Sequence, residues 1–355
     1  MSSTPTAALR PVLAELPEYP AVSYVMPVLN EAAHLAEAVG AVLSQEYPGE
    51  QELVLALGAS SDGTDEVAAQ LAASDPRVRL VANPRNDIPI GLNLAIRASR
   101  NPVVIRVDAH AELPAGYTVA MIEMLRRTGA ANVGGVMEAK GRGRFQQAVA
   151  RAYNSPFGLG GGSWHHGEEE AECDSAYLGV FRREVLDEVG LYDETLRRAE
   201  DWELNHRIRA AGHLILFTPK QKVTYWPRST WDALRRQMYA TGVWRGALVR
   251  RHQSTPWRYL PPPAVAVLVG FSLVIGVLQL LGGARGSAWA LAHVPSLGYL
   301  AGVTAVGVTR LGGDGPVDRL LNVVVLATMH LAWGSGFIRG WLFGAETTVD
   351  RSRLR

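Results

Sequence analysis

The sequence predicts an α/β domain with a mostly parallel sheet, followed by a hydrophobic helical region. Over roughly the first 220 residues, short apolar segments alternate with segments of helical periodicity, as in βαβ units. Polar clusters follow these apolar segments where strands end, which is where ligands bind in open α/β sheets. Long uncharged stretches follow residue 259. A chain of 355 residues is long enough for both parts.

Three of the first four predicted strands are near-continuous apolar runs, as expected for strands buried on both faces. Apolar residues at helical spacing predict the intervening helices, and Asn30 is expected to cap the first of them. The strands are predicted at 22–26, 53–57, 78–81 and 102–107, and the helices at 31–44, 64–73 and 91–99.

The pattern continues with a helix at 114–127 and a strand at 131–137. Residues 140–170 are rich in glycine and polar residues, which predicts a long loop that is either functional or disordered. Strands at 177–181 and 213–217 and helices at 182–189 and 200–211 complete the domain.

Composition excludes several classes of protein. The net charge of +1 gives no overall attraction to nucleic acid, so no nucleic-acid partner is expected. A single cysteine excludes an intramolecular disulfide and argues against a Cys-based metal site. The first twenty residues lack the apolar core of a signal peptide, so we expect the first domain to lie in the cytoplasm.

Three uncharged stretches in the C-terminal region are long enough to cross a membrane, which takes about 20 mainly apolar residues. We expect transmembrane helices at about 261–283, 287–309 and 319–343. The alternative is a buried helical core. Three crossings would put the arginine-rich tail outside, against the positive-inside bias, so either one helix does not cross fully or a re-entrant segment exists.

Arginines and tryptophans are interleaved just before the first of these stretches. Residues 234–260 contain six arginines and no acidic residue. This combination is also typical of nucleic-acid binding. Its position beside a membrane segment favours helices at the cytoplasmic membrane interface.

Four polar groups at strand or helix ends are candidates for chemistry. Asp108 and His110, two residues apart after the fourth strand, can both face one cation; alternatively Asp108 caps a turn and His110 lies on the surface. Residues 27–31 and 60–65 offer helix N-termini, which bind anions but also simply need capping. The acids at 200 and 201 fit a general base or favourable charges at a helix N-terminus.

These groups together resemble a known family. Pro27-Val-Leu-Asn30-Glu31, Ser60-Ser61-Asp62-Gly63-Thr64, Asp108-Ala109-His110 and Glu200-Asp201-Trp202 occur in the order seen in family 2 glycosyltransferases with the GT-A fold. The resemblance covers about residues 20–250. Ile88-Pro-Ile-Gly-Leu-Asn93 and Gln237-Met-Tyr-Ala-Thr-Gly-Val-Trp244-Arg245 are similar to the succinoglycan-type branch, whose members have a hydrophobic C-terminal tail.

The resemblance implies a role for each matching residue. Asp108 and His110 bind the divalent cation, Mg²⁺ or Mn²⁺, that bridges the diphosphate of the donor. Asp201 is the catalytic base, with Glu200 beside it. The implied substrate-binding residues are Pro27, Asn30, Glu31, Asp62, Trp202, Gln237, Trp244 and Arg245.

The implied protein is a membrane-anchored, metal-dependent, inverting glycosyltransferase of the cell membrane with a cytoplasmic catalytic domain. It moves a sugar from a nucleotide-sugar donor, by default a UDP-sugar, to a lipid-linked or polysaccharide acceptor. Alternatives are sugar transfer to a polyprenyl phosphate and a catalytically silent membrane scaffold. Leu57-Gly58-Ala59 stands where most relatives have one or two Asp, which leaves the nucleotide open. His110 replaces the second acid of the metal motif, which favours tolerance of Mn²⁺.

The expected organisation has five parts. A flexible N-terminal segment (1–20) precedes the GT-A domain (21–230). Basic and aromatic interfacial helices (231–260), transmembrane helices (261–345) and a short tail (346–355) follow.

Overall fold

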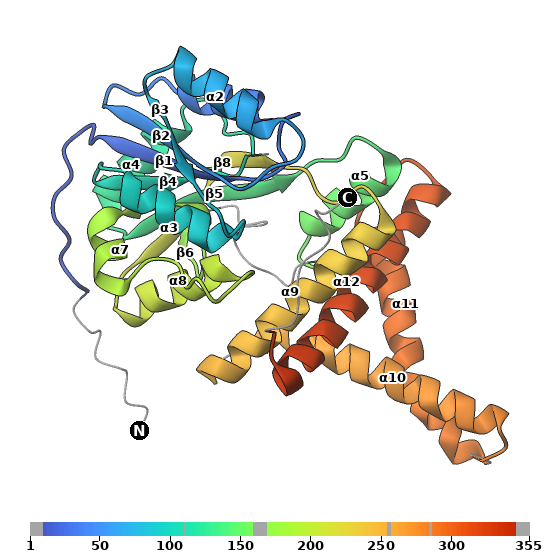
Figure 1. Cartoon of the computed structure of the whole chain (residues 1–355). Helices are drawn as coiled ribbons and strands as arrows, with labels where there is room; N and C mark the ends of the chain where they lie inside the picture. Colours follow the sequence, from blue (N-terminus) through green and yellow to red (C-terminus); the bar gives the residue numbers. More distant parts are fainter. Residues whose placement is uncertain (1–9, 110, 159–168, 254–256, 284–285, 346–355) are drawn as a thin grey trace, which may run out of the picture. The chain divides into compact units, whose positions relative to one another are not determined.

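The computed structural model describes residues 10–109, 111–158, 169–253, 257–283 and 286–345 (Figure 1). These residues form two compact units. The first unit contains residues 10–138 and 169–225, and the second contains residues 139–158 and 226–345. Each unit is described by itself below.

The first unit is built on one sheet, whose described strands lie in the order β3-β2-β1-β4-β7-β5-β8-β6. The strands are β1 (Val22–Val28), β2 (Gln51–Leu57), β3 (Val78–Ala82), β4 (Val103–Arg106), β5 (Asn132–Ala139), β6 (Ala171–Glu172), β7 (Tyr177–Arg182) and β8 (Ile215–Tyr225). The helices are α1 (Leu35–Leu43), α2 (Thr64–Ser74), α3 (Ile88–Ala98), α4 (Tyr117–Thr128), α7 (Arg183–Val189) and α8 (Glu200–Ala210).

Strands β1 to β4 are parallel, which confirms the mostly parallel α/β sheet. Val25 on β1 lies opposite Val54 on β2 and opposite Arg106 on β4. The carboxyl ends of these three strands therefore meet at one edge of the sheet. β7 joins the other side of β4 in the antiparallel sense, so the parallel pattern stops there.

The main hydrophobic core forms where three helices cover one face of the sheet. Tyr24 and Met26 of β1 are 1% and 0% exposed and belong to a buried cluster with apolar side chains of α1, α2 and α4. Val25, which alternates with them, is also fully buried. Strands covered on both faces are continuous apolar runs, which is the pattern seen in the sequence.

Two local predictions are wrong. Asn30 does not cap the first helix: its φ is 54°, and α1 begins at Leu35 after His34. The segment 140–170 is not a continuous loop, because α5 (Arg144–Tyr153) lies within it. The buried side chains of α5 include Ala148, Val149 and Ala152, a helical spacing that the glycine content of the segment obscured.

The second unit is helical. It contains α5, α9 (Trp231–His252), η1 (Trp257–Tyr259), α10 (Pro261–Leu280), η2 (Ser287–His293), α11 (Val294–Thr309) and α12 (Pro316–Phe343). Within the described residues, Pro261–Leu280, Ser287–Thr309 and Pro316–Phe343 are long and apolar enough to cross a membrane. The expectation of C-terminal apolar helices that could span a membrane is confirmed.

Candidate active site

The turns that follow β1 and β2 are bonded to each other. The backbone N–H of Asn30 donates to Ser60 Oγ at 3.1 Å, and Asn30 Oδ1 accepts from the Ser61 N–H at 2.9 Å. The Glu31 N–H donates to Thr64 Oγ1 at 2.8 Å. The left-handed backbone of Asn30, a conformation that asparagine tolerates, directs its side chain across to the second turn. The two turns therefore act as one ordered rim at the carboxyl edge of the sheet.

Asp62 completes this rim. Its carboxylate accepts hydrogen bonds from Thr64 Oγ1 and from the backbone N–H groups of Thr64 and Ala32, the last two at 3.2 Å. The Thr64 hydroxyl is the main cause of a pKa below the usual value for Asp62. Asp62 is thus ionised and holds the turns together. Pro27 lies just before them, on β1.

A cluster of carboxylates forms where β4 meets the first turn of α8. Asp108 lies two residues beyond β4, and Glu200 and Asp201 are the first two residues of α8. Ala199, which precedes them, has a φ of 61°, a strained conformation for an alanine. A strained backbone conformation persists only where contacts with the surrounding structure stabilise it. Such contacts therefore help to orient the carboxylates at the start of α8.

The side chain that gathers these carboxylates is Arg106, the last residue of β4. Its guanidinium donates to Asp108 Oδ1 at 3.2 Å, to Glu200 Oε1 at 3.3 Å, and to Asp201. The Arg106 side chain is only 7% exposed. Burial lowers its pKa, but Asp201 and Asp108 outweigh this and raise it well above the usual value. Arg106 is therefore a permanent buried cation.

Asp201 is the most accessible of the three acids, with 38% of its side chain exposed against 18% for Asp108 and 10% for Glu200. Desolvation raises the pKa of Asp201, Arg106 lowers it, and the charges of Glu200 and Asp108 raise it, to about 7 in all. A carboxylate with a pKa near neutrality is suited to accept a proton at physiological pH.

Two further residues support this cluster. The guanidinium of Arg106 lies 5.9 Å from the centre of the Tyr192 ring. Tyr192 is fixed by Asn93 on α3, whose Oδ1 accepts from the Tyr192 N–H and whose Nδ2 donates to the Tyr192 carbonyl, both at 2.9 Å. Both Asn93 and Tyr192 are buried.

The carboxylates of this cluster suit a divalent cation that takes most of its ligands from the enzyme's substrate. The described residues contain no group of three His, Cys, Asp or Glu side chains arranged to hold a metal. Three carboxylates nevertheless share one guanidinium, which leaves a surplus of negative charge. Mg²⁺ is commonly bound by one or two carboxylates, with substrate phosphates as further ligands. Asp108 can supply such a carboxylate; His110, the other predicted ligand, lies outside the described residues.

The other predicted substrate-binding residues have different surroundings. Trp202 on α8 is 5% exposed and stacks on His206 at 5.3 Å. Gln237, Trp244 and Arg245 lie on α9 in the second unit. There Gln237 and Trp244 are buried, and the Arg245 guanidinium lies 4.5 Å from the Tyr259 ring centre.

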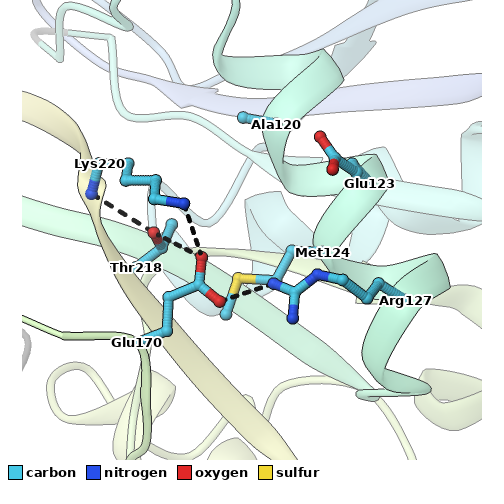
Figure 2. Close-up of a pocket in the computed structure, with 7 residues that line it drawn as sticks. All are labelled: Ala120, Glu123, Met124, Arg127, Glu170, Thr218 and Lys220. Atoms are coloured by element: carbon cyan, nitrogen blue, oxygen red, sulfur yellow. Dashed lines mark hydrogen bonds and ion pairs between the residues drawn. The ribbon is translucent and has the colours of Figure 1, made fainter.

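A pocket of about 290 Å³ lies elsewhere in the first unit, between α4 and β8 (Figure 2). Three of its four charged lining residues, Arg127, Glu170 and Lys220, are joined by ion pairs. Glu170 accepts from Arg127 at 2.6 Å and from Thr218 at 3.3 Å, and it lies 3.8 Å from Lys220 Nζ. None of the seven lining residues belongs to the carboxylate cluster. We therefore interpret this pocket as an ion-pair cluster at the edge of the sheet.

The fold and the carboxylate cluster define a glycosyltransferase of the GT-A class. The sequence model of "Glycosyl transferase family 2" matches residues 23–190. The chain is 33% identical over 319 residues to the succinoglycan biosynthesis protein ExoA of Rhizobium meliloti (strain 1021), with 89% of this chain and 93% of that protein covered. The chain therefore belongs to glycosyl transferase family 2, as its motifs predicted.

Two further proteins are similar. One is a Methanococcus voltae transferase named dolichyl N-acetyl-alpha-D-glucosaminyl phosphate 3-beta-D-2,3-diacetamido-2,3-dideoxy-beta-D-glucuronosyltransferase, 21% identical over 65% of this chain and 74% of that one. The other is the structure of the mannosyltransferase PcManGT from Pyrobaculum calidifontis in complex with GDP-Man and Mn²⁺. Its TM-score is 0.56 at 19% identity, with 96% of this chain and 91% of that chain covered, which shows a shared fold.

Proposed function

We propose that this glycosyltransferase moves a sugar from a nucleotide-sugar donor to a lipid-linked or polysaccharide acceptor, with inversion, at the cytoplasmic face of the cell membrane. The observation that carries the proposal is the gathering of Asp108, Glu200 and Asp201 around Arg106. This gathering supports the roles that we propose for Asp108 as a metal ligand and for Asp201 as a base, close together near the carboxyl edge of the parallel strands.

Asp201 is the residue we propose as the base. Its carboxylate takes the proton of the acceptor hydroxyl as the oxygen attacks C1 of the donor sugar. The new C1–O bond forms on the face opposite the breaking bond to the diphosphate, so the anomeric configuration inverts. The raised pKa and exposed edge of Asp201 suit this task.

Asp108 is the residue we propose to hold the divalent cation. A bound Mg²⁺ or Mn²⁺ neutralises charge that develops on the leaving diphosphate. Arg106 lies opposite Val25 in the sheet, and Asp108 lies two residues beyond Arg106. Asp108 is therefore at the same edge of the sheet as Pro27 and the turns that follow β1 and β2. The Mn²⁺ bound in the PcManGT complex supports a cation in this fold.

The membrane region supports an acceptor that is itself in the membrane. The helices Pro261–Leu280, Ser287–Thr309 and Pro316–Phe343 are long and apolar enough to cross a membrane. The name of the similar Methanococcus voltae protein includes a dolichyl-linked compound. A lipid-linked acceptor places its reactive end at the membrane surface, where a tethered catalytic domain meets it.

The test is an assay of isolated membranes containing the full chain. A panel of sugar nucleotides is supplied with Mn²⁺, and transfer to endogenous lipid or glycan is followed with and without EDTA. We expect one donor to be used and EDTA to abolish its use. Asp108→Asn should remove the Mn²⁺-dependent transfer, whereas Asp187→Asn, an exposed carboxylate on α7, should not.

If the protein neither binds nor turns over any sugar nucleotide in the presence of Mn²⁺, the proposal is overturned and the silent scaffold is favoured. Transfer by Asp108→Asn at the wild-type rate would overturn only the role of Asp108 as the metal ligand.

A further inference from the structure

Helices α9 and α12 pack backbone to backbone. Each carries a pair of glycines four residues apart, Gly242 and Gly246 on α9 and Gly336 and Gly340 on α12. A Cβ atom at any of these four positions would lie closer than 3.0 Å to the backbone of the partner helix. Small residues at this spacing let two helices approach closely. The glycine pairs of both helices therefore favour this close packing.

The two helices run in the same direction. Near the start of the contact, Trp231 Nε1 donates to Thr328 Oγ1 at 2.9 Å. Near its end, Arg250 Nη1 donates to the Leu342 carbonyl at 2.9 Å. The sequence separations are 97 and 92 residues, so α9 is aligned with residues 328–342 of α12 (Figure 1).

The part of helix α9 between its terminal arginine pairs is too short to cross a bilayer. Exposed arginines stand at both of its ends, Arg235 and Arg236 at one and Arg250 and Arg251 at the other. Asp232 pairs with the first two, both at 2.9 Å. The intervening residues 237–249 span about 20 Å at roughly 1.5 Å per residue. The hydrocarbon core is about 30 Å thick, so α9 suits the interface rather than the interior.

Arg245 strengthens this argument. It lies in the middle of α9, within the stretch that contacts α12, and its guanidinium packs on the Tyr259 ring. Tyr259 in turn stacks on Trp333 of α12 at 6.1 Å. If this half of α12 crossed the bilayer, a guanidinium would lie at the depth of the hydrocarbon, which is costly.

The first half of α12 is also bound to a charged helix. Arg151 Nε on α5 donates to Asn322 Oδ1 at 3.0 Å, and Asn322 donates to the Gly307 and Gly312 carbonyls at 3.0 and 2.8 Å. Residues 316–327 span only about 18 Å. In the most apolar part of α12, 39% of the residues are buried in the protein, against 11% in each of the other two candidate spans.

We infer that only α10 and η2–α11 cross the membrane, and that α9 and α12 lie together at its surface. The arginine pairs at the two ends of α9 then face anionic lipid headgroups, which attract such residues. The inference rests on the proposed membrane location. Two crossings return the chain to the side of the catalytic unit, so the arginine-rich sequence 351–355 is cytoplasmic, in agreement with the positive-inside bias.

Labelling of cysteines introduced one at a time into the full chain, in its native membrane, tests the inference. Cysteines are placed at Glu66→Cys on α2, at Gly283→Cys between α10 and η2, and after Arg355. Both substituted positions are exposed. A membrane-impermeant maleimide is applied to spheroplasts and to inverted vesicles. We expect little labelling of the natural Cys173, because it is buried and its burial raises the pKa of the thiol.

We expect the Glu66 and C-terminal cysteines to react only in inverted vesicles, and the Gly283 cysteine only in spheroplasts. Reaction of the C-terminal cysteine in spheroplasts, together with Gly283→Cys, would show an odd number of crossings and overturn the inference while leaving the membrane anchor intact. Reaction of Gly283→Cys only in inverted vesicles would show that α10 does not cross and would also overturn the inference.

Discussion

The guanidinium of Arg106 donates to the carboxylate of Glu200 at 3.3 Å, across a sequence separation of 94 residues. One residue ends β4 and the other begins α8. Because the same guanidinium also binds Asp108 and Asp201, one buried cation holds together the candidate metal ligand and the candidate base. The geometry of the proposed active site depends on this side chain.

Replacing Arg106 with methionine should damage both folding and catalysis. Three carboxylates would lose their counter-ion, and removal of one partner from a buried ion pair costs about 3–5 kcal/mol of unfolding free energy. Displacement of the base by about 1 Å is enough to lower the rate roughly 100-fold. Thermal unfolding in detergent and initial transfer rates measure the two effects.

Arg106→Lys is the matched control for that variant. It keeps the charge but not the planar fork that reaches three carboxylates, so it should recover more of the stability than of the rate. A methionine variant with wild-type stability and rate would show that the guanidinium does not organise the site.

The pH dependence of transfer should report Asp201. Its pKa is raised, to about 7, so the carboxylate is progressively protonated, and kcat/KM falls, as the pH drops through that range. Glu200 contributes to the increase through its negative charge. Glu200→Gln should therefore lower the pKa of Asp201 and move the ascending limb to lower pH. A limb that moved to higher pH would contradict the assignment.

The α9–α12 contact should tolerate no side chain at Gly340. Its Cβ would overlap the backbone around Val243, so Gly340→Leu must separate the helices. Overpacking of this kind costs about 1–3 kcal/mol. Gly302→Leu on α11 is the matched control, because nothing lies within 4 Å of that position. Equal thermal stability of the two variants would show that the backbone contact is absent.

The parallel core of the fold was predictable because buried strands leave a simple signal. Strands β1, β2 and β4 are mostly buried and apolar, and each of the four parallel strands is followed by residues of helical periodicity. The start of α1 was not predictable in the same way. Asn30 has the chemistry of a helix cap, but its side chain bonds to the Ser61 N–H on a turn that lies thirty-one residues further along the chain.

The candidate site was predicted in part, and the missing residue was the one at its centre. Asp108, Glu200 and Asp201 follow strand or helix boundaries, where motifs are readable. Arg106 lies at the end of β4 within a buried apolar run, between Ile105 and Val107. Its three partners are known only once β4 and α8 are placed together. A lone charge in a buried run was nevertheless a usable signal, because such a charge is seldom buried without partners.

The most direct test of the central claim is the transfer rate of Asp201→Asn. The amide has nearly the shape of the carboxylate but cannot accept the proton of the acceptor hydroxyl. Loss of a general base lowers a rate by about 10²–10⁴-fold. We predict a loss in this range in isolated membranes, with binding of the nucleotide sugar retained. Transfer by Asp201→Asn at the wild-type rate would contradict the assignment of Asp201 as the base.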